Sequence, residues 1–189
     1  LQYFIEWRIE VYDVDNNQVY KHIFNASKKR VFINFESKAL GDTIAWFPYV
    51  EEFRKKHNCE LAVSTFHNSW FEEKYPKIDF IQKGSTVYDL YAQYNIGWFY
   101  NGDNINYNRV PINFRVNSLG RTCSSTLGLE YKEIKPKLTF KNTGALINEP
   151  YICIAPHASA HSKYWNYPGG WQTIIDYLKL RVKEISEMK

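Results

Sequence analysis

The sequence predicts an α/β fold, because short buried strands alternate along it with an amphipathic helix. Residues 31–35 form an apolar run that is typical of a strand buried in a parallel sheet. Apolar side chains recur three positions apart from Ile44 to Phe53, which predicts a helix that runs to about residue 57. Residues 60–64 again favour a strand. Strand, helix and strand in this order form the repeating unit of α/β folds.

Further elements continue this alternation toward the C-terminal end. We expect a short helix at 69–74, strands at 78–81 and 91–99, an Asn/Gly/Asp-rich loop at 101–108 and a helix at 116–127 that Gly128 ends. A polar linker is expected at 141–150. A new strand at 151–155 and an amphipathic helix at 171–182 then predict the first step of a second α/β domain.

The N-terminal end does not belong to this core. Residues 3–12 and 19–24 flank a turn cluster and predict an added β-hairpin. The expected organisation is therefore a hairpin at 1–28, a Rossmann-like domain at 29–145 and the beginning of a second Rossmann-like domain at 146–189. We expect the chain to be cut before that second domain closes.

Bulk composition narrows the class of protein. Of the 189 residues, 44% are apolar, enough for a packed core, and 17% are aromatic, which favours a ligand cleft or an interface. The net charge of +4 comes from interspersed charges, which excludes a nucleic-acid-binding stripe. No apolar run is long enough for a membrane span. Cys59, Cys123 and Cys153 lack metal-ligand spacing, so we expect buried thiols in a reducing cytoplasm and no metal site.

The first candidate site is Gly41-Asp42, between the first core strand and its helix. In open α/β sheets, ligands bind beyond the carboxyl ends of the strands, and a glycine there lets the backbone approach a ligand. Asp42 could act as a general base that deprotonates an acceptor hydroxyl. The alternative is that Asp42 simply caps the helix that follows.

The second candidate site is the loop after the strand predicted at 151–155. Ser159, Ser162 and Lys163 suit a diphosphate, because hydroxyls donate hydrogen bonds and an ammonium group supplies positive charge. The alternative is a polar interdomain loop with Lys163 in solvent.

Two further histidines, at positions 57 and 67, enter the prediction. His67 and Asn68 follow the second core strand and therefore lie toward the same ligand edge, where they could contact an acceptor or make a loop hydrogen bond. His57, at the end of a polar helix, is expected to be exposed.

Two motifs resemble those of a known family. Residues 41–48 match the Gly-Asp-x5-Pro signature of the heptosyltransferase-like glycosyltransferases (glycosyltransferase family 9-like), and small residues at 155–159 before Lys163-Tyr164-Trp165 resemble its second signature. Residues 39–46, 64–68 and 163–166 are more similar still to the autotransporter O-heptosyltransferases. The resemblance covers most of the chain.

This resemblance implies a GT-B fold of two Rossmann-like domains. It implies inverting transfer of heptose from ADP-heptose to serine hydroxyls of an autotransporter adhesin in the cytoplasm, without metal catalysis and with no cofactor in this chain. The subgroup's iron-binding cysteines would lie beyond Lys189, and its members form homo-oligomers. The cut chain alone is expected to be inactive, because half of a cleft cannot hold the donor.

The resemblance also implies roles for single residues. Asp42 looks like the general base, and Lys163 looks like the residue that meets the donor diphosphate, supported by Gly41, Ser159 and Ser162. His67 and Asn68 would lie on the acceptor side. The alternative function is a non-catalytic α/β binding or assembly module with a Tyr-rich surface. A dinucleotide oxidoreductase is disfavoured, because no Gly-x-Gly-x-x-Gly follows the first strand.

Overall fold

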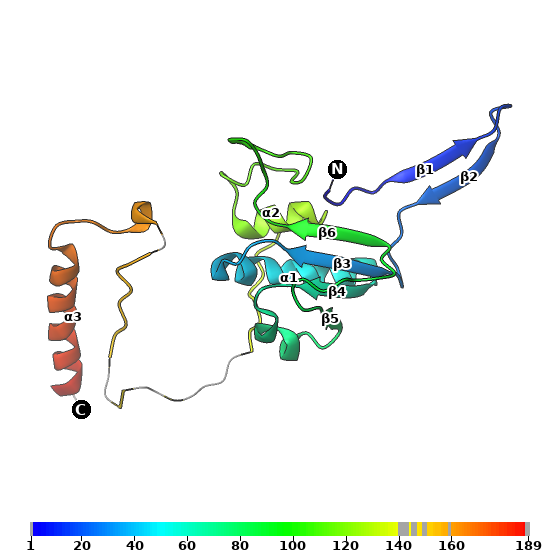
Figure 1. Cartoon of the computed structure of the whole chain (residues 1–189). Helices are drawn as coiled ribbons and strands as arrows, with labels where there is room; N and C mark the ends of the chain where they lie inside the picture. Colours follow the sequence, from blue (N-terminus) through cyan, green and yellow to red (C-terminus); the bar gives the residue numbers. More distant parts are fainter. Residues whose placement is uncertain (1, 140–143, 145–146, 149–150, 159, 188–189) are drawn as a thin grey trace. The chain divides into compact units, whose positions relative to one another are not determined.

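Four parallel strands form the centre of the fold in the computed structural model (Figure 1). They are β3 (Arg30–Phe35), β4 (Glu60–Ser64), β5 (Ile78–Phe80) and β6 (Ala92–Ile96), in the spatial order β5-β4-β3-β6. The chain runs from β3 to β4 and β5 on one side and then returns to β6 on the other side of β3. The predicted α/β fold with a parallel sheet is confirmed, and its strand order reverses between β3 and β6.

The structure describes residues 2–139, 144, 147–148, 151–158 and 160–187. They belong to two compact units, Leu1–Phe140 and Lys141–Lys189. The linker predicted at 141–150 falls mostly outside the described residues. Among those described, no helix has the length and apolar character needed to cross a bilayer.

Helix α1 (Leu40–His57) contributes more buried residues to the core cluster than any other described element. Trp46, Phe47 and Phe53 are fully buried, and the Phe47 ring stacks on Phe71 with centroids 3.8 Å apart. The predicted apolar stripe is therefore the buried face. The helix ends where Asn58 adopts a left-handed conformation at φ 47° and its N–H bonds back to the last turn.

The remaining predicted elements are shorter than expected. The stretch predicted as one helix forms two 3-10 turns, η1 (Asn68–Trp70) and η2 (Glu72–Lys74), and the 101–108 loop contains a small hairpin of β7 (Tyr100–Asn101) and β8 (Asn104–Ile105). Helix α2 (Leu119–Thr126) begins late, because the Ser118 hydroxyl caps it by accepting a hydrogen bond from the Arg121 N–H at 3.3 Å.

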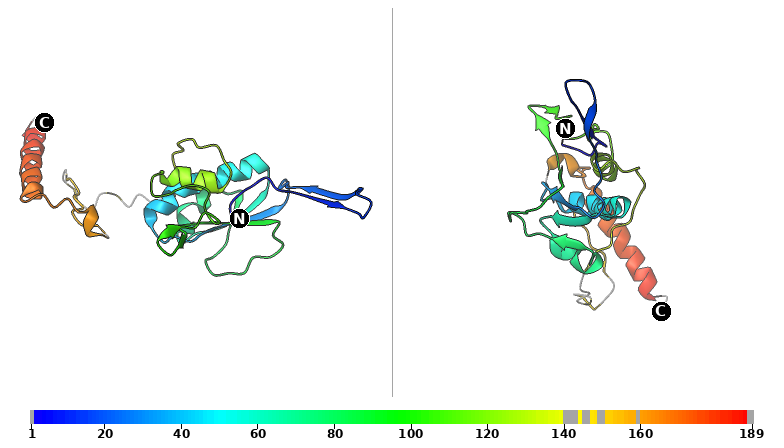
Figure 2. Two further views of the ribbon diagram at one scale, coloured as in Figure 1. Left: turned by 90° about the horizontal axis from the view of Figure 1, so that it is seen from above. Right: turned by 90° about the vertical axis from the view of Figure 1, so that its right-hand side faces the viewer.

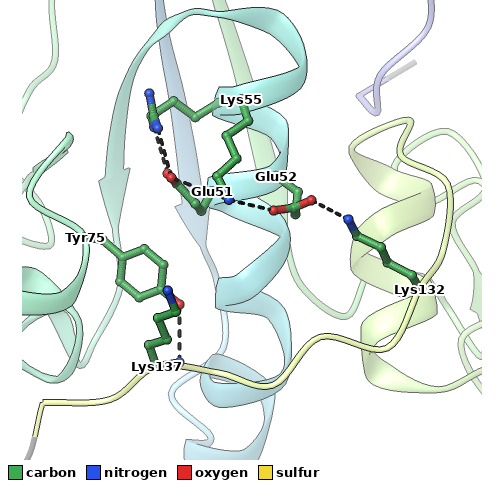
Figure 3. Close-up of polar contacts among 7 residues, drawn as sticks. Glu51, Glu52, Lys55, Tyr75, Lys132 and Lys137 are labelled. Carbon is green, nitrogen blue, oxygen red and sulfur yellow. Dashed lines mark hydrogen bonds and ion pairs between the residues drawn. The ribbon is translucent and has the colours of Figure 1, made fainter.

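An extended segment, residues 129–139, crosses the outer face of α1 (Figure 3). Lys132 pairs with Glu52 at 2.7 Å, and the Tyr49 hydroxyl donates to the Lys132 carbonyl at 2.8 Å. Farther along, the Lys137 N–H donates to the Tyr75 hydroxyl at 3.3 Å. The first two contacts bind the segment to α1, and the third binds it to the residue that follows η2.

The N-terminal hairpin consists of β1 (Arg8–Tyr12) and β2 (Gln18–Ile23), which pair only with each other. It reaches away from the four-stranded sheet (Figures 1 and 2). His22 contacts the Tyr91 hydroxyl at 3.0 Å and ties its base to the core. Along its length it exposes several large apolar side chains: Ile9, Val11, Val19, Tyr20 and Ile23.

The second unit differs from its prediction. The strand expected at 151–155 is absent: residues 151–158 are irregular, and Tyr151 and Ile152 are about half exposed. A strand requires a neighbour to satisfy its N–H and C=O groups, and the described residues of this unit offer none. Cys153 is accordingly exposed, whereas Cys59 and Cys123 are buried as expected. Helix α3 (Gly170–Glu187) confirms the predicted amphipathic helix.

The exposure predicted for His57 is wrong. Its ring lies between Phe4, Phe24 and Phe53, with centroids 5.0, 6.1 and 4.4 Å away, and its Nε2 is buried without a hydrogen-bond partner among the described residues. Burial lowers the pKa of His57, and the neighbouring Lys56 lowers it further. The helix end is polar in sequence, but the N-terminal segment folds back over it.

His57 should therefore make stability depend on pH. The unfolded chain protonates this imidazole below about pH 6.5, whereas the folded chain resists protonation until lower pH, so stability is lost as pH falls. We expect His57→Phe, which suits the aromatic surroundings, to flatten the dependence of unfolding free energy on pH between 5 and 7, as measured by urea denaturation. Equal slopes for the two proteins would contradict this account of the cluster.

Candidate active site

The candidate site lies where the carboxyl ends of the four strands meet. In a parallel sheet these ends share one edge, and ligands bind there at the point where the strand order reverses. The loop between β3 and α1, residues 36–39, and the segment after β6 flank that reversal point. The Glu36 N–H donates to the Ile96 carbonyl at 2.8 Å and fastens the two together.

Asp42 is held in the first turn of α1 by two donors. The Ser37 hydroxyl and the Trp98 indole N–H both donate to its Oδ2, each at 2.6 Å. Asp42 does not cap the helix: the cap position is Ala39, which makes no side-chain capping bond. The structure therefore uses this carboxylate to link the β3–α1 loop to the segment after β6.

The two oxygens of Asp42 differ as a result. Both hydrogen bonds fill Oδ2, and no described residue donates to Oδ1. The side chain is only partly buried. A carboxylate with one fixed oxygen and one available oxygen can accept a proton from an incoming hydroxyl.

The sequence analysis did not identify Trp98 or Ser37 as residues of the site. Trp98 fell inside the strand predicted at 91–99, but β6 ends at Ile96, so Trp98 already belongs to the ligand edge. Its ring packs on Trp46 and Phe114, with centroids 5.3 and 5.0 Å away, which fixes the indole N–H on Asp42. One rule could have found both residues: the residues that directly follow parallel strands all lie at the carboxyl-end edge of the sheet.

The two glycines of this edge differ in their surroundings. A Cβ added at Gly97 would lie 2.8 Å from Glu36 Cβ, so the close approach of the two loops requires glycine there. A Cβ added at Gly41 would meet no atom within 4 Å. Gly41 is exposed and leaves the backbone open to a ligand.

His67 and Asn68 lie on the loop after β4. The Asn68 side chain accepts from the Thr65 N–H and hydroxyl at 2.8 and 2.9 Å and donates to the Ile81 carbonyl at 2.9 Å. Asn68 thus makes the loop hydrogen bonds that the sequence left open as an alternative. His67 stacks on Trp70 at 4.3 Å, and its Nε2 lies 3.2 Å from the Lys38 carbonyl.

Lys83, which the sequence did not single out, fixes the end of β3. Its ammonium donates to Asn34 Oδ1 at 2.7 Å and to the Phe35 carbonyl at 2.6 Å. Burial lowers the pKa of Lys83. Asn34 in turn donates to Glu36 Oε1 at 2.8 Å, so the strand enters the β3–α1 loop in a fixed geometry.

The residues of the second candidate site belong to the second unit. Lys163 ends the short turn η3 (His161–Lys163), and Ser162 and Lys163 are both exposed. Ser159 lies outside the described residues. Trp165 packs against the start of α3, where its carbonyl accepts from the Trp171 indole N–H at 3.1 Å.

The chain was compared with known proteins in sequence and in structure. No protein-family profile matches the chain. It is 35% identical over 182 residues to the autotransporter heptosyltransferase Aah of Escherichia coli, covering 94% of this chain and 46% of Aah. The crystal structure of TibC, a bacterial iron-containing dodecameric glycosyltransferase from enterotoxigenic E. coli H10407, matches with a TM-score of 0.81 and 30% identity, over 94% of this chain and 46% of TibC.

The resemblance to autotransporter heptosyltransferases is confirmed. The chain spans about half the length of these relatives. A second TibC structure, in complex with ADP-D-beta-D-heptose, matches equally well at a TM-score of 0.81 and 29% identity. A relative from Burkholderia thailandensis, 28% identical over 94% of this chain, is the inactive autotransporter heptosyltransferase BimC. Because heptosyltransferases and an inactive relative both match, activity has to be argued from the site itself.

The iron of TibC finds no counterpart among the described residues. They contain no group of three or more His, Cys, Asp or Glu side chains arranged to hold a metal. Cys59 and Cys123 are buried singly, and Cys153 belongs to the other unit. These residues do not fit an iron site.

Gly41 should tolerate a methyl group that Gly97 does not. We expect Gly41→Ala to stabilise the chain by roughly 0.5–1 kcal/mol, because alanine favours the helix and meets open space. Gly97→Ala is the matched control and should destabilise the chain, because its methyl group collides with Glu36. Urea denaturation measures both. A destabilised Gly41→Ala variant would mean that the fold itself requires this glycine.

Proposed function

We propose that the chain is the acceptor-side half of an inverting GT-B heptosyltransferase, together with the opening of its donor-side domain. The observation that carries this proposal is the Asp42 carboxylate, fixed through Oδ2 with Oδ1 available at the reversal point of the sheet. The similarity to Aah and TibC over 94% of the chain supports heptose as the sugar and an autotransporter as the acceptor protein. ADP-heptose as the donor is supported by the TibC complex.

The proposed reaction is a direct displacement at the anomeric carbon. Asp42 Oδ1 takes the proton of a serine hydroxyl while the serine oxygen bonds to the anomeric carbon. The bond from that carbon to the diphosphate breaks with its electron pair, and ADP leaves from the opposite face, which inverts the anomeric configuration. Lys163, with Ser159 and Ser162, would stabilise the negative charge that develops on the leaving diphosphate.

Both domains are needed for this chemistry. Catalysis by positioning depends on holding donor and acceptor within bonding reach, and a lone acceptor-side unit cannot fix the donor. The 189-residue chain is therefore proposed to be inactive by itself. The buried free thiols Cys59 and Cys123 suit the reducing cytoplasm, which we propose as the compartment.

A chimera tests the role of Asp42, with residues 1–189 replacing the matching 46% of Aah. We expect it to transfer heptose to a serine peptide. Asp42→Asn should lower kcat by at least about 100-fold, the lower range for loss of a general base, while the Kd for ADP-heptose changes little. Lys163→Ala is the contrasting variant and should weaken binding of ADP and ADP-heptose.

Each assignment can fail separately in this experiment. A native transfer rate in the Asp42→Asn chimera would remove Asp42 as the base. Unchanged ADP affinity in the Lys163→Ala chimera would remove Lys163 from the donor site. Circular dichroism of each variant distinguishes lost chemistry from lost folding.

Assembly is a second candidate function, and the hairpin favours it. A two-stranded hairpin is marginally stable in water, and β1 and β2 expose apolar side chains such as Val11, Val19 and Tyr20. TibC is dodecameric. We propose that the whole protein forms a homo-oligomer and that the hairpin contributes to its contacts.

A further inference from the structure

A groove opens beside the candidate active site, at the carboxyl ends of β4 and β5. It has a volume of about 570 Å³. Its walls come from the segments after the two strands, and we call it the β4–β5 groove. Its lining includes Phe66, Asn68, Ser69, Glu72, Gln82 and Lys83.

The walls of the β4–β5 groove are held in place by the protein itself. The Asn68 side chain joins the segment after β4 to the segment after β5 through Thr65 and the Ile81 carbonyl. The His67 ring stacks on Trp70 with an interplanar angle of 15°. The groove is therefore already formed and would not have to order its loops when a ligand binds.

One short loop connects the groove to Asp42. Ser37, which donates to Asp42 Oδ2, is followed directly by Lys38, whose carbonyl contacts the His67 ring at 3.2 Å. Asp42 faces the β6 side of this loop through Trp98, and the groove lies on its β4–β5 side. An extended polypeptide that presents a hydroxyl to Asp42 could thus cross the loop and enter the groove.

Positive charge gathers at this crossing. The ammonium groups of Lys38 and Lys83 lie 5.4 and 4.7 Å from the centroid of the same Phe66 ring. Among the described residues, no carboxylate forms a salt bridge with either lysine. The nearby Glu36 carboxylate acts to raise the pKa of Lys83 against the larger lowering by burial, and the exposed Glu72 also lines the groove. The two like charges over one ring still repel each other, and an anion placed between them would relieve that repulsion.

We propose that the β4–β5 groove binds the acceptor polypeptide next to the modified serine, and that Lys38 and Lys83 favour a segment that carries a carboxylate side chain. This proposal rests on the proposed function and adds a peptide subsite to it. The Phe66 ring offers an apolar surface for the side chain's methylene groups. Exposed Ser69 and Gln82 offer hydrogen-bonding partners for the peptide backbone.

The test measures peptide binding without any sugar donor. Three fluorescent peptides share one sequence with a single serine and carry Asp, Asn or Lys a few residues away from it. Fluorescence anisotropy gives their affinities for the 189-residue chain. We expect the Asp peptide to bind about fivefold more tightly than the Asn peptide, as an exposed charge pair allows, and the Lys peptide to bind most weakly.

Lys38→Glu leaves one ammonium and one carboxylate group at the crossing, so the Asp and Lys peptides should then bind with similar affinity. Lys135→Glu is the matched control, because it changes the net charge equally at an exposed lysine that lines a different groove, along α1. It should keep the original order. Lys83 is left unchanged in these variants, because it also fixes the end of β3.

Two outcomes would overturn the proposal. Equal affinities for the three peptides would show that the lysines do not read the peptide's charge. Displacement of every peptide by millimolar pyrophosphate, but not by chloride at the same ionic strength, would assign the lysines to a phosphate ligand instead. The peptide test measures binding and not sugar transfer. An inactive chimera would therefore count against the proposed function but would leave the peptide-binding result unchanged.

Discussion

The candidate site depends on one constraint: a single carboxylate oxygen, Asp42 Oδ2, accepts two hydrogen bonds. Ser37 belongs to the loop after β3 and Trp98 to the segment after β6, so their two hydrogen bonds close the reversal point of the sheet. The same bonds fix the orientation of the other oxygen, Oδ1. The side chain that we propose as the general base is therefore also a structural link between two loops.

The rest of the unit supports this link through packing. The Trp98 ring lies against Trp46, which is fully buried in α1, so the indole N–H is positioned by the aromatic core. Lys83 holds the end of β3 from the opposite side. A group whose rotamer is fixed by its neighbours loses little entropy when it acts, which is what precise positioning of a base requires.

The sequence predicted the parallel sheet and α1, because a buried strand and a helical apolar stripe are local patterns that packing then reinforces. It also located Asp42, because the end of a strand before a helix is recognisable. It could not reveal Trp98 or Ser37 as partners, since those contacts depend on which strand lies beside β3. His57 and residues 151–155 were mispredicted for the same reason: burial and strand formation depend on neighbours distant in sequence.

The account is tested most directly by the steady-state transfer rate of the Aah chimera that carries both Trp98→Phe and Ser37→Ala. Phenylalanine keeps an aromatic ring against Trp46 and Phe114 but has no N–H, so the change removes both donors to Asp42 with little loss of packing. The account predicts a fall in kcat of about tenfold or more, with an unchanged KM for ADP-heptose. A kcat equal to that of the unmodified chimera would contradict it.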